Sequence, residues 1–260
     1  MLDVLKQQVV DLEKRVSQSP LQPAEKIAVF DLDDTLLIGD IGDAVFAFLT
    51  LQGLRLKLSW QEYQRLLHIH RSKAYLGVVE AMAGLEAEAV IEATQAVMDS
   101  NDSYLTVQSD RVRAPKPRPL LSGFVSFLLD RQYQVYVLSA SNHISVQHVS
   151  EQWFHIPPSH SFGIQSRLRD GKLTSELTEP VPVGFGKAHS FKLVAGSSLP
   201  LITATDSRID LPLMRLTHPL GLTLWVGDDR IDYGVVMELS RPGQRFFLLD
   251  ASEQVPLNEF

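Results

Sequence analysis

The chain has 260 residues, no cysteine and a formal net charge of −7 at pH 7. This length suits one large domain carrying a smaller insertion, and the apolar and charged fractions of 45% and 21% are ordinary for a globular protein. The absence of cysteine excludes disulfides, thiolate metal sites and thiol nucleophiles. Net negative charge argues against nucleic acid or an anionic membrane as the main partner. No apolar run is long enough to cross a bilayer and the first residues lack a secretory pattern, so we expect no membrane partner and a cytoplasmic location.

The first residues predict an amphipathic helix over 2–17. Apolar side chains recur there at spacings of three and four, at Leu2, Leu5, Val9, Leu12 and Val16. Pro20 and Pro23 follow and do not continue a helix. We expect this helix to pack on the core just before the first strand.

The stretch 26–37 carries the strongest indication of chemistry. A short apolar run predicts a buried strand of an α/β sheet, and three acids and a threonine follow it, namely Asp31, Asp33, Asp34 and Thr35. Ligands of such sheets bind beyond the carboxyl ends of the strands. Asp31 and Asp33 would point to the same side if the extended backbone continues. Clustered carboxylates need a metal ion or a shared proton, which favours a divalent-metal phosphoryl-transfer site with Asp31 as nucleophile. The alternative is that these acids only cap a turn or a helix start.

A proline-free block follows, with apolar residues at helical spacing. We predict helices at about 42–53, 58–69, 73–82 and 86–101. A helical block inserted after the first strand is a plausible cap that excludes water and selects substrates. The basic, proline-rich stretch 111–119 is the predicted link back to the core, although a simple surface loop would have the same sequence.

Three further polar positions follow predicted core strands. Ser139 lies in the strand 134–142, Lys187 opens a helix after a glycine-rich turn, and Asp206 and Asp210 follow the strand 200–205. Taken one at a time, each has a simpler explanation, such as a helix cap at Ser141 or Asn142 or an exposed lysine. We also predict helices over 120–131 and 143–153. A strand–turn–strand unit is predicted over 162–177, with its turn at Asp170-Gly171, and further strands at 222–226 and 245–250.

Taken together, the motifs resemble those of the haloacid dehalogenase superfamily of phosphotransferases. Asp31-Leu32-Asp33-Asp34-Thr35 resembles the first motif, Ser139 the second, Lys187 the third, and Asp206 with Asp210 the fourth. The Ser139-Ala140-Ser141 sequence is typical of the phosphoserine-phosphatase-like branch. Thr205 stands where the fourth motif usually has glycine. Gly227-Asp228-Asp229-Arg230-Ile231-Asp232 has the same spacing, but Asp206 and Asp210 follow Lys187 more closely, as in the family, and we prefer them to Asp228 and Asp232.

The resemblance covers residues 26–250 and implies an α/β fold, a Rossmann-like parallel sheet core with an inserted helical cap. The core would comprise residues 1–40 and 111–260, with the N-terminal helix in 1–20, and the cap residues 41–110. No Gly-x-Gly-x-x-Gly follows a strand, so a dinucleotide site is not expected.

The implied activity is Mg²⁺-dependent hydrolysis of a phosphomonoester. Asp31 would attack phosphorus to give an aspartyl-phosphate, and Asp33 would protonate the leaving oxygen and then activate water. A halide leaving group needs no general acid, so Asp33 favours a phosphatase over a dehalogenase. Asp31, Asp33 through its carbonyl oxygen, and Asp206 would hold the metal, with Asp210 orienting a metal-bound water or Lys187. Ser139, Lys187 and Thr35 would bind the phosphate.

The substrate class is less narrowly determined by the sequence. Asp40 lies where the phosphoserine-phosphatase branch carries a cap-entry glutamate, and a carboxylate there could bind an ammonium group. Phosphoserine, phosphoethanolamine and phosphocholine are therefore candidate small-molecule substrates, while the alternative is that Asp40 is only a turn residue. Two other classes are a catalytically weak phosphate-binding or regulatory protein of the same fold and a signalling receiver domain. The complete motif set argues against the first, and the length and the inserted helices argue against the second.

Overall fold

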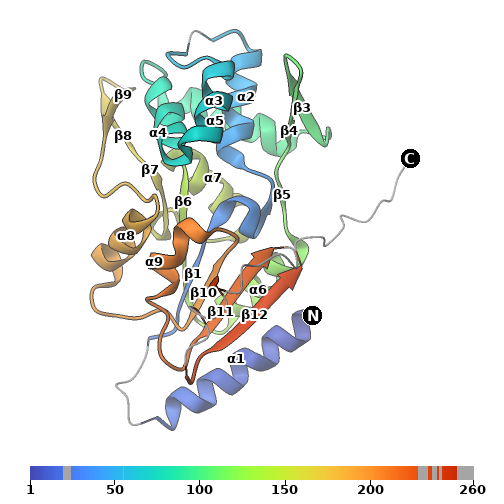
Figure 1. Cartoon of the computed structure of the whole chain (residues 1–260), viewed down its shortest axis with the longest axis vertical. Coiled ribbons are helices and arrows are strands. Elements are labelled where there is room, and N and C mark those ends of the chain that lie inside the picture. Colours follow the sequence, from blue (N-terminus) through green and yellow to red (C-terminus); the bar gives the residue numbers. More distant parts are fainter. Residues whose placement is uncertain (20–24, 55, 228–233, 236–238, 240–241, 251–260) are drawn as a thin grey trace.

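The structure is a computed structural model that describes the chain except residues 20–24, 55, 228–233, 236–238, 240–241 and 251–260 (Figure 1). Within the described part, no helix has the length and apolar character needed to span a membrane. The second acidic pair considered above, Asp228 and Asp232, lies outside the described residues.

A six-stranded sheet forms the core, and all of its strands run parallel in the order β12-β11-β10-β1-β6-β7. Its members are β1 (Ile27–Phe30), β6 (Gln134–Asn142), β7 (Ser161–Ile164), β10 (Ile202–Thr205), β11 (Leu222–Gly227) and β12 (Arg245–Asp250). Parallel strands are covered on both faces and therefore read as continuous apolar runs, as in β1, where every residue is buried. The central place of β1, between β10 and β6, confirms the predicted Rossmann-like α/β core.

Helices cover both faces of this sheet. They are α1 (Leu2–Ser17), α6 (Pro119–Asp130), α7 (His143–Phe154), α8 (Phe185–Ala195) and α9 (Leu211–Met214). Successive side chains of β1 alternate between the faces. Phe30 belongs to the core cluster shared with α1 and α6, whereas Val29 packs in a second cluster with Phe191 of α8 and Leu213 of α9. The predicted N-terminal helix is confirmed, and Leu5 is among its fully buried residues.

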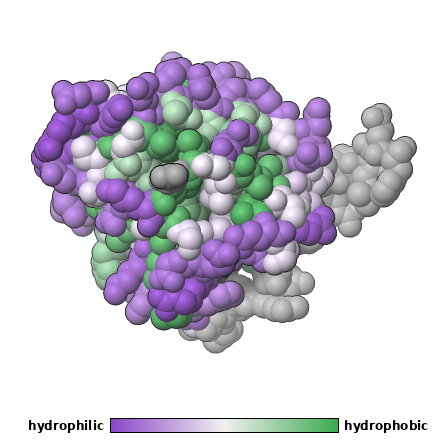
Figure 2. Space-filling model, turned by 90° about the horizontal axis from the view of Figure 1, so that it is seen from above, coloured by the Kyte–Doolittle hydropathy of each residue, from purple (hydrophilic) through white to green (hydrophobic). Residues whose placement is uncertain are grey.

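Four helices stand beyond the carboxyl ends of β1 and β6, close to the predicted positions (Figure 1). They are α2 (Ile41–Leu51), α3 (Trp60–Ile69), α4 (Arg71–Ala81) and α5 (Ala87–Asp99). The chain reaches them through β2 (Leu37–Ile38) and returns through β5 (Lys116–Pro117), which pair antiparallel. Seen from this end of the molecule, the surface is mainly hydrophilic with smaller apolar areas between (Figure 2). The α2–α5 helices are called the cap below.

The cap ends in a hairpin that the sequence analysis did not predict. Strands β3 (Tyr104–Val107) and β4 (Asp110–Arg113) pair antiparallel, so the predicted link does not begin at Arg111, which lies within β4. The turn between them contains Gln108 at a φ of 57°. Each strand has only four residues, which leaves too short an alternation to be recognised against the helical pattern before it.

The segment 161–177 also differs from the prediction. Its first residues form β7 in the main sheet, and a separate hairpin follows, β8 (Ser166–Arg169) and β9 (Lys172–Leu177). The predicted turn at Asp170-Gly171 is confirmed, and both residues have positive φ. The backbone of Leu173 exchanges hydrogen bonds of 2.8 Å with Gly84 and Leu85, which ties this hairpin to the cap.

Candidate active site

The turn Leu32–Leu36, directly after β1, positions the predicted catalytic acids. Asp34 adopts a left-handed backbone with φ 53°, a conformation that aspartate tolerates better than most residues. Its N–H donates to the carbonyl oxygen of Gly39, and the N–H of Gly39 donates back to Asp34 Oδ1, each at 3.1 Å. The chain thereby turns sharply into the cap and leaves Asp31 and Asp33 beside the same cleft.

Arg118 stabilises this turn through hydrogen bonds to its backbone. Its guanidinium is buried and donates to the carbonyl oxygens of Thr35 and Asp34 at 2.9 Å each, and of Leu37 at 3.5 Å. Carbonyl groups in such a turn have no regular ladder partner, and buried carbonyls without donors are costly. The arginine therefore replaces the hydrogen bonds that the irregular backbone cannot make for itself.

We predict that Arg118→Met lowers the free energy of unfolding by about 2 to 4 kcal/mol, because it removes charge-assisted bonds to buried carbonyl groups. Urea denaturation at neutral pH measures this loss. Arg167→Met, at an exposed position of β8, is the matched control and should stay within about 0.5 kcal/mol of the unaltered protein. Equal stability of both variants would contradict the supporting role.

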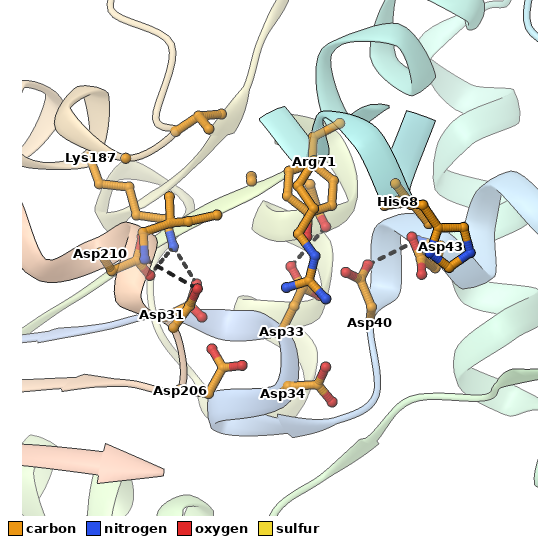
Figure 3. Close-up of a pocket in the computed structure, with 18 of the residues that line it drawn as sticks. Asp31, Asp33, Asp34, Asp40, Asp43, His68, Arg71, Lys187, Asp206 and Asp210 are labelled. Atoms are coloured by element: carbon orange, nitrogen blue, oxygen red, sulfur yellow. Dashed lines mark hydrogen bonds and ion pairs between the residues drawn. The ribbon is translucent and has the colours of Figure 1, made fainter. Parts of the chain in front are cut away.

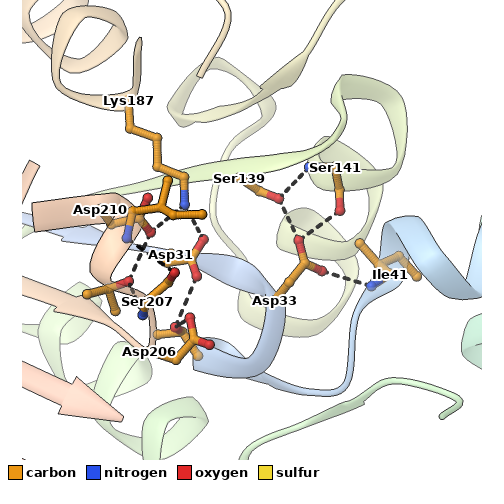
Figure 4. A network of polar contacts seen from close by, with 12 residues as sticks. Asp31, Asp33, Ile41, Ser139, Ser141, Lys187, Asp206, Ser207 and Asp210 are labelled. Atoms are coloured by element: carbon orange, nitrogen blue, oxygen red, sulfur yellow. Dashed lines mark hydrogen bonds and ion pairs between the residues drawn. The ribbon is translucent and has the colours of Figure 1, made fainter. Parts of the chain in front are cut away.

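Lys187 joins two of the acids. Its Nζ lies 2.6 Å from Asp31 Oδ1 and 2.6 Å from Asp210 Oδ2, and all three side chains are buried (Figure 4). Burial disfavours the ammonium, but Asp210 and Asp31 attract it and together raise the pKa of Lys187. Thr205 donates to Asp210 Oδ2 at 2.9 Å, so the residue that stands in the usual glycine position orients the lysine's partner. Lys187 is therefore a permanent cation beside Asp31.

Asp33 has a different set of partners. Ser139 and Ser141 donate to its Oδ2 at 2.6 and 2.8 Å, and the N–H of Ile41 donates to its Oδ1 at 2.8 Å (Figure 4). Burial raises the pKa of Asp33, although these hydrogen bonds act in the opposite direction. Asp31 and Asp33 thus have different surroundings. Asp31 lies beside a cation and Asp33 among hydroxyl groups, which suits two different chemical roles.

Thr35 and Asp206 complete the cluster. Thr35 is fully buried, and its hydroxyl donates to Asp31 Oδ2 at 3.1 Å and to Asp206 Oδ1 at 3.4 Å. Burial, followed by the charges of Asp31 and Asp34, raises the pKa of Asp206 to about 9. Thr35 does not line the cleft, so it lies behind the carboxylates rather than in the space open to a ligand.

The donor set fits a magnesium ion. The core contributes the ammonium of Lys187 and five carboxylates to the lining of the cleft, so negative charge is in excess there. The carboxylates are those of Asp31, Asp33, Asp34, Asp206 and Asp210. Asp33 Oδ2 accepts from the two serines, and Asp210 Oδ2 and Asp31 Oδ1 are paired with Lys187. Asp31 Oδ2 and Asp206 Oδ1 lie beside the same Thr35 hydroxyl. Among the described residues, no three acid or histidine side chains converge as a complete metal cage. Mg²⁺ usually takes one or two carboxylates and keeps several waters.

The cap completes a cleft of about 270 Å³ over these residues (Figure 3). Its contributions to the lining include Asp40, Asp43, His68, Arg71 and Tyr75. Asp40 accepts from the N–H of Asp43 at 2.9 Å at the start of α2, so it caps this helix and also faces the cleft. Burial and the charges of Asp33 and Asp43 raise the pKa of Asp40 well above its usual value. The structure therefore shows Asp40 as a helix cap that also lines the cleft, and its binding of an ammonium stays a prediction.

Ser141 is the functional residue that sequence reasoning missed, since it was considered only as a helix cap. Asn142 caps α7, while the hydroxyl of Ser141 binds Asp33 and accepts from the N–H of Gly42 at 3.1 Å. A Cβ on Gly42 would lie 2.6 Å from that hydroxyl oxygen, so this approach requires glycine. The alternation of an extended strand places positions 139 and 141 on one side, and this signal could have identified Ser141.

Comparisons with known proteins identify the family and the fold. The family model for haloacid dehalogenase-like hydrolase matches residues 28–215. No curated protein matches the chain. Among solved structures, a protein of unknown function from Bordetella pertussis Tohama I has a TM-score of 0.63 at 18% identity, covering 86% of this chain and 98% of that one.

Two further structures share the fold. A phosphoserine phosphatase solved as a phospho-aspartyl intermediate analogue has a TM-score of 0.54 at 16% identity, covering 86% of this chain and 95% of that one. A haloacid dehalogenase family hydrolase from Salmonella enterica serovar Typhi has a TM-score of 0.56 at 13% identity, covering 92% and 75%. The resemblance expected from the four motifs is thus confirmed, and this chain belongs to the haloacid dehalogenase-like hydrolases.

Proposed function

We propose that the protein is a phosphatase that hydrolyses a small phosphomonoester through a phosphorylated Asp31. The observation that carries this proposal is the separation of the two acids, with Asp31 held against Lys187 at 2.6 Å and Asp33 surrounded by Ser139, Ser141 and the N–H of Ile41. A nucleophile must be ionised, and a general acid must hold a proton. Burial raises the pKa of both acids, but the charge of Lys187 favours ionised Asp31, whereas Asp33 has no cation among these partners and its hydrogen bonds only partly oppose its raised pKa.

In the first step, an Asp31 oxygen forms a bond to phosphorus while the bond from phosphorus to the leaving oxygen breaks. Asp33 transfers its proton to that leaving oxygen. In the second step, the Asp33 carboxylate takes a proton from water, whose oxygen attacks the aspartyl-phosphate and releases inorganic phosphate with Asp31 restored. The raised pKa of Asp33 supports this exchange of roles, because the same group must both give and accept a proton.

In this proposal Lys187 stabilises the developing phosphoryl charge, and a bound magnesium ion would add to this stabilisation. Lys187 stays protonated between Asp31 and Asp210, and we infer that it pairs with phosphoryl oxygens as their charge increases. Asp31, Asp206 and the carbonyl oxygen of Asp33 would hold Mg²⁺, which supplies further neutralisation of the phosphoryl charge. In this proposal Asp210 orients Lys187. Ser139, which like Thr35 does not line the cleft, orients Asp33. Thr35 holds Asp31 and Asp206 from behind.

We infer that the leaving group carries an ammonium close to the cap. Asp40 and Asp43 both line the cleft, and the Tyr63 hydroxyl donates to Asp43 from behind. Two carboxylates in a low-dielectric wall attract a cation. Phosphoserine, phosphoethanolamine and phosphocholine carry this group, and Arg71 in the same lining offers a partner for a carboxylate such as that of phosphoserine.

Phosphate release from a panel of phosphomonoesters tests the function. The panel contains these three compounds, sugar phosphates and 4-nitrophenyl phosphate, each measured with Mg²⁺ and with a chelator. We expect release that needs added Mg²⁺ and is fastest for an amine-bearing substrate. If no compound releases phosphate while Mg²⁺ binding is still detected by calorimetry, the alternative of a phosphate-binding protein without turnover is favoured.

We predict that the protein binds an ammonium-bearing substrate more tightly than a neutral one only when the pH is above about 6. Burial raises the pKa of Asp43 to about 6, with the Tyr63 hydrogen bond opposing and the charge of Asp34 adding to this shift. Below that value Asp43 is neutral and does not attract a cation, whereas above it the carboxylate is ionised. The KM of phosphoethanolamine should therefore fall between pH 5 and pH 7, relative to the KM of n-propyl phosphate.

The n-propyl ester has nearly the same size and no ammonium. Because the ammonium lowers the second pKa of the phosphate in phosphoethanolamine, each KM is expressed per concentration of phosphate dianion, using the pKa of each ester measured by titration. Asp43→Asn should flatten this ratio across the pH range. A ratio that keeps its pH dependence in Asp43→Asn would exclude Asp43 as the titrating group.

A further inference from the structure

A second and wider hollow opens beside the catalytic cleft. It has a volume of about 610 Å³, and part of its wall is the cap hairpin β3–β4, which stands beside α2 (Figure 1). Five residues line both spaces: Asp34, Asp40, Asp43, Gln64 and Leu67. Residues 109–113 of the hairpin line only the wider hollow. A substrate whose phosphoryl group lies at Asp31 can therefore continue past Asp40 toward the hairpin.

Two arginines gather around one tyrosine on this hairpin. The guanidinium carbon of Arg111 lies 4.0 Å from the centre of the Tyr104 ring, and that of Arg113 lies 5.9 Å from it. Tyr104 is directly opposite Arg113 in the register, and positions 111 and 113 share one face of β4. The aromatic ring thus restricts both side chains before any ligand binds.

The two positive charges are not neutralised within the hairpin. In the part of the chain that the structure describes, neither arginine forms an ion pair with a carboxylate. The neighbouring acid, Asp110, accepts from Trp60 Nε1 at 2.8 Å. Like charges held close together repel one another, and an anion between them removes this repulsion. Guanidinium groups bind phosphate and carboxylate with paired hydrogen bonds.

The position of Arg113 links the pair to the catalytic turn. A Cβ built on Gly39 would lie 3.3 Å from Arg113 Cγ, so the aliphatic part of this arginine packs against Gly39. Gly39 has a φ of 104° and accepts from the N–H of Asp34 at 3.1 Å. Arg113 is therefore anchored where the chain passes from the catalytic turn to the cap.

We propose that Arg111 and Arg113 bind a second anionic group, a phosphate or a carboxylate, at the far end of the substrate's leaving group. This inference rests on the proposed phosphatase function, because it describes the substrate of that same cleft. The favoured substrate class is an elongated phosphomonoester with a distal anion rather than a compact ester alone. Asp40 and Asp43 lie between the two anion sites, where they would contact the middle of such a molecule.

A matched series of alkanediol phosphates tests this proposal. The monophosphates and bisphosphates of ethane-1,2-diol to hexane-1,6-diol differ only in the distal anion and its reach. We expect one chain length at which the bisphosphate has a KM about tenfold below that of its monophosphate, with kcat unchanged within about twofold. Arg111→Gln and Arg113→Gln should each raise that KM about fivefold, and the double variant should abolish the preference.

Arg167→Gln is the control, because it removes one exposed positive charge from hairpin β8–β9 and should leave every KM unchanged. Turnover of 4-nitrophenyl phosphate by the double variant shows that its catalytic centre is intact. Three results would each overturn the proposal. The preference for the bisphosphate could persist in the double variant, or it could be missing at every chain length. It could also be independent of chain length, as a separate free-anion site would give.

Calorimetry separates failure of this inference from failure of the proposed function. Hexane-1,6-diol bisphosphate and the shorter bisphosphates are titrated into Asp31→Asn, with and without the two arginine substitutions. Arginine-dependent binding without turnover of any phosphomonoester by the unaltered protein would reject the phosphatase and retain the anion site. Turnover of 4-nitrophenyl phosphate together with equal binding in both backgrounds would retain the phosphatase and reject the site.

Discussion

Asp31→Asn should lower kcat for every phosphomonoester by about 10⁴-fold or more, because it removes the carboxylate that we propose attacks phosphorus. Asparagine keeps the shape of the side chain but is a very weak nucleophile. The fold should persist, because the neutral asparagine leaves Lys187 paired with Asp210, which lies 2.6 Å from it. Phosphate release and thermal denaturation, measured on the same samples, separate loss of chemistry from loss of structure.

Asp170→Asn provides the matched control for this substitution. Asp170 lies in the β8–β9 turn with φ 52°, a conformation that asparagine also adopts readily, so activity and stability should be unchanged. Rapid-quench mass measurement should detect a phosphoryl group on the unaltered enzyme and none on Asp31→Asn. More than a tenth of the original activity in Asp31→Asn would mean that another group is the nucleophile.

Asp33→Asn should lower kcat for alkyl phosphates by about 10² to 10⁴-fold, because their leaving oxygens need a proton as the bond to phosphorus breaks. The 4-nitrophenolate ion leaves without protonation, so the first turnover of 4-nitrophenyl phosphate should remain fast. In the proposed mechanism, hydrolysis of the aspartyl-phosphate also needs Asp33 as base. The expected result is a burst of one nitrophenolate per active site, followed by slow turnover.

Stopped-flow absorbance measures the burst and the steady state in one experiment. Ser139→Ala is a useful companion variant, since Ser139 donates to Asp33 at 2.6 Å and Ser141 keeps a second donor at 2.8 Å. It should show a smaller loss of the same kind. An equal loss of the first turnover for alkyl and aryl substrates in Asp33→Asn would argue against the general-acid role.

The cap illustrates where prediction from sequence stops. Helices α2 to α5 are long enough for their apolar periodicity to be read directly, and their bounds fall close to the predicted ones. The β3–β4 hairpin could not be predicted in this way, because its strands are short and packing on α2 stabilises them. The local sequence carries no pattern that indicates them. Val107 and Val112 are its buried residues, and their burial depends on a neighbour that the local sequence does not reveal.

Arg118 and Ser141 show the same limit at the site. Arg118 lies in a proline-rich stretch that the sequence predicts to be a link, yet the residue is only 3% exposed. Its guanidinium binds carbonyl groups of a turn more than 80 residues earlier in the chain. Nothing in the neighbouring residues distinguishes it from the exposed arginines 111 and 113. Ser141 could have been inferred from strand alternation, but its bond to the N–H of Gly42 depends on where the cap begins.

The sequence by itself determined the parallel α/β core, the acidic turn after β1 and the order of the four motifs, because apolar runs and clustered polar residues are local properties of the chain. Only the tertiary structure decided how the charges are paired. Lys187 reaches Asp31 across 156 residues and also binds Asp210, whereas Asp33 is bonded to two serines of β6. The carboxyl ends of β1, β6 and β10 meet at one edge of the sheet, and side-chain reach and burial there select each partner.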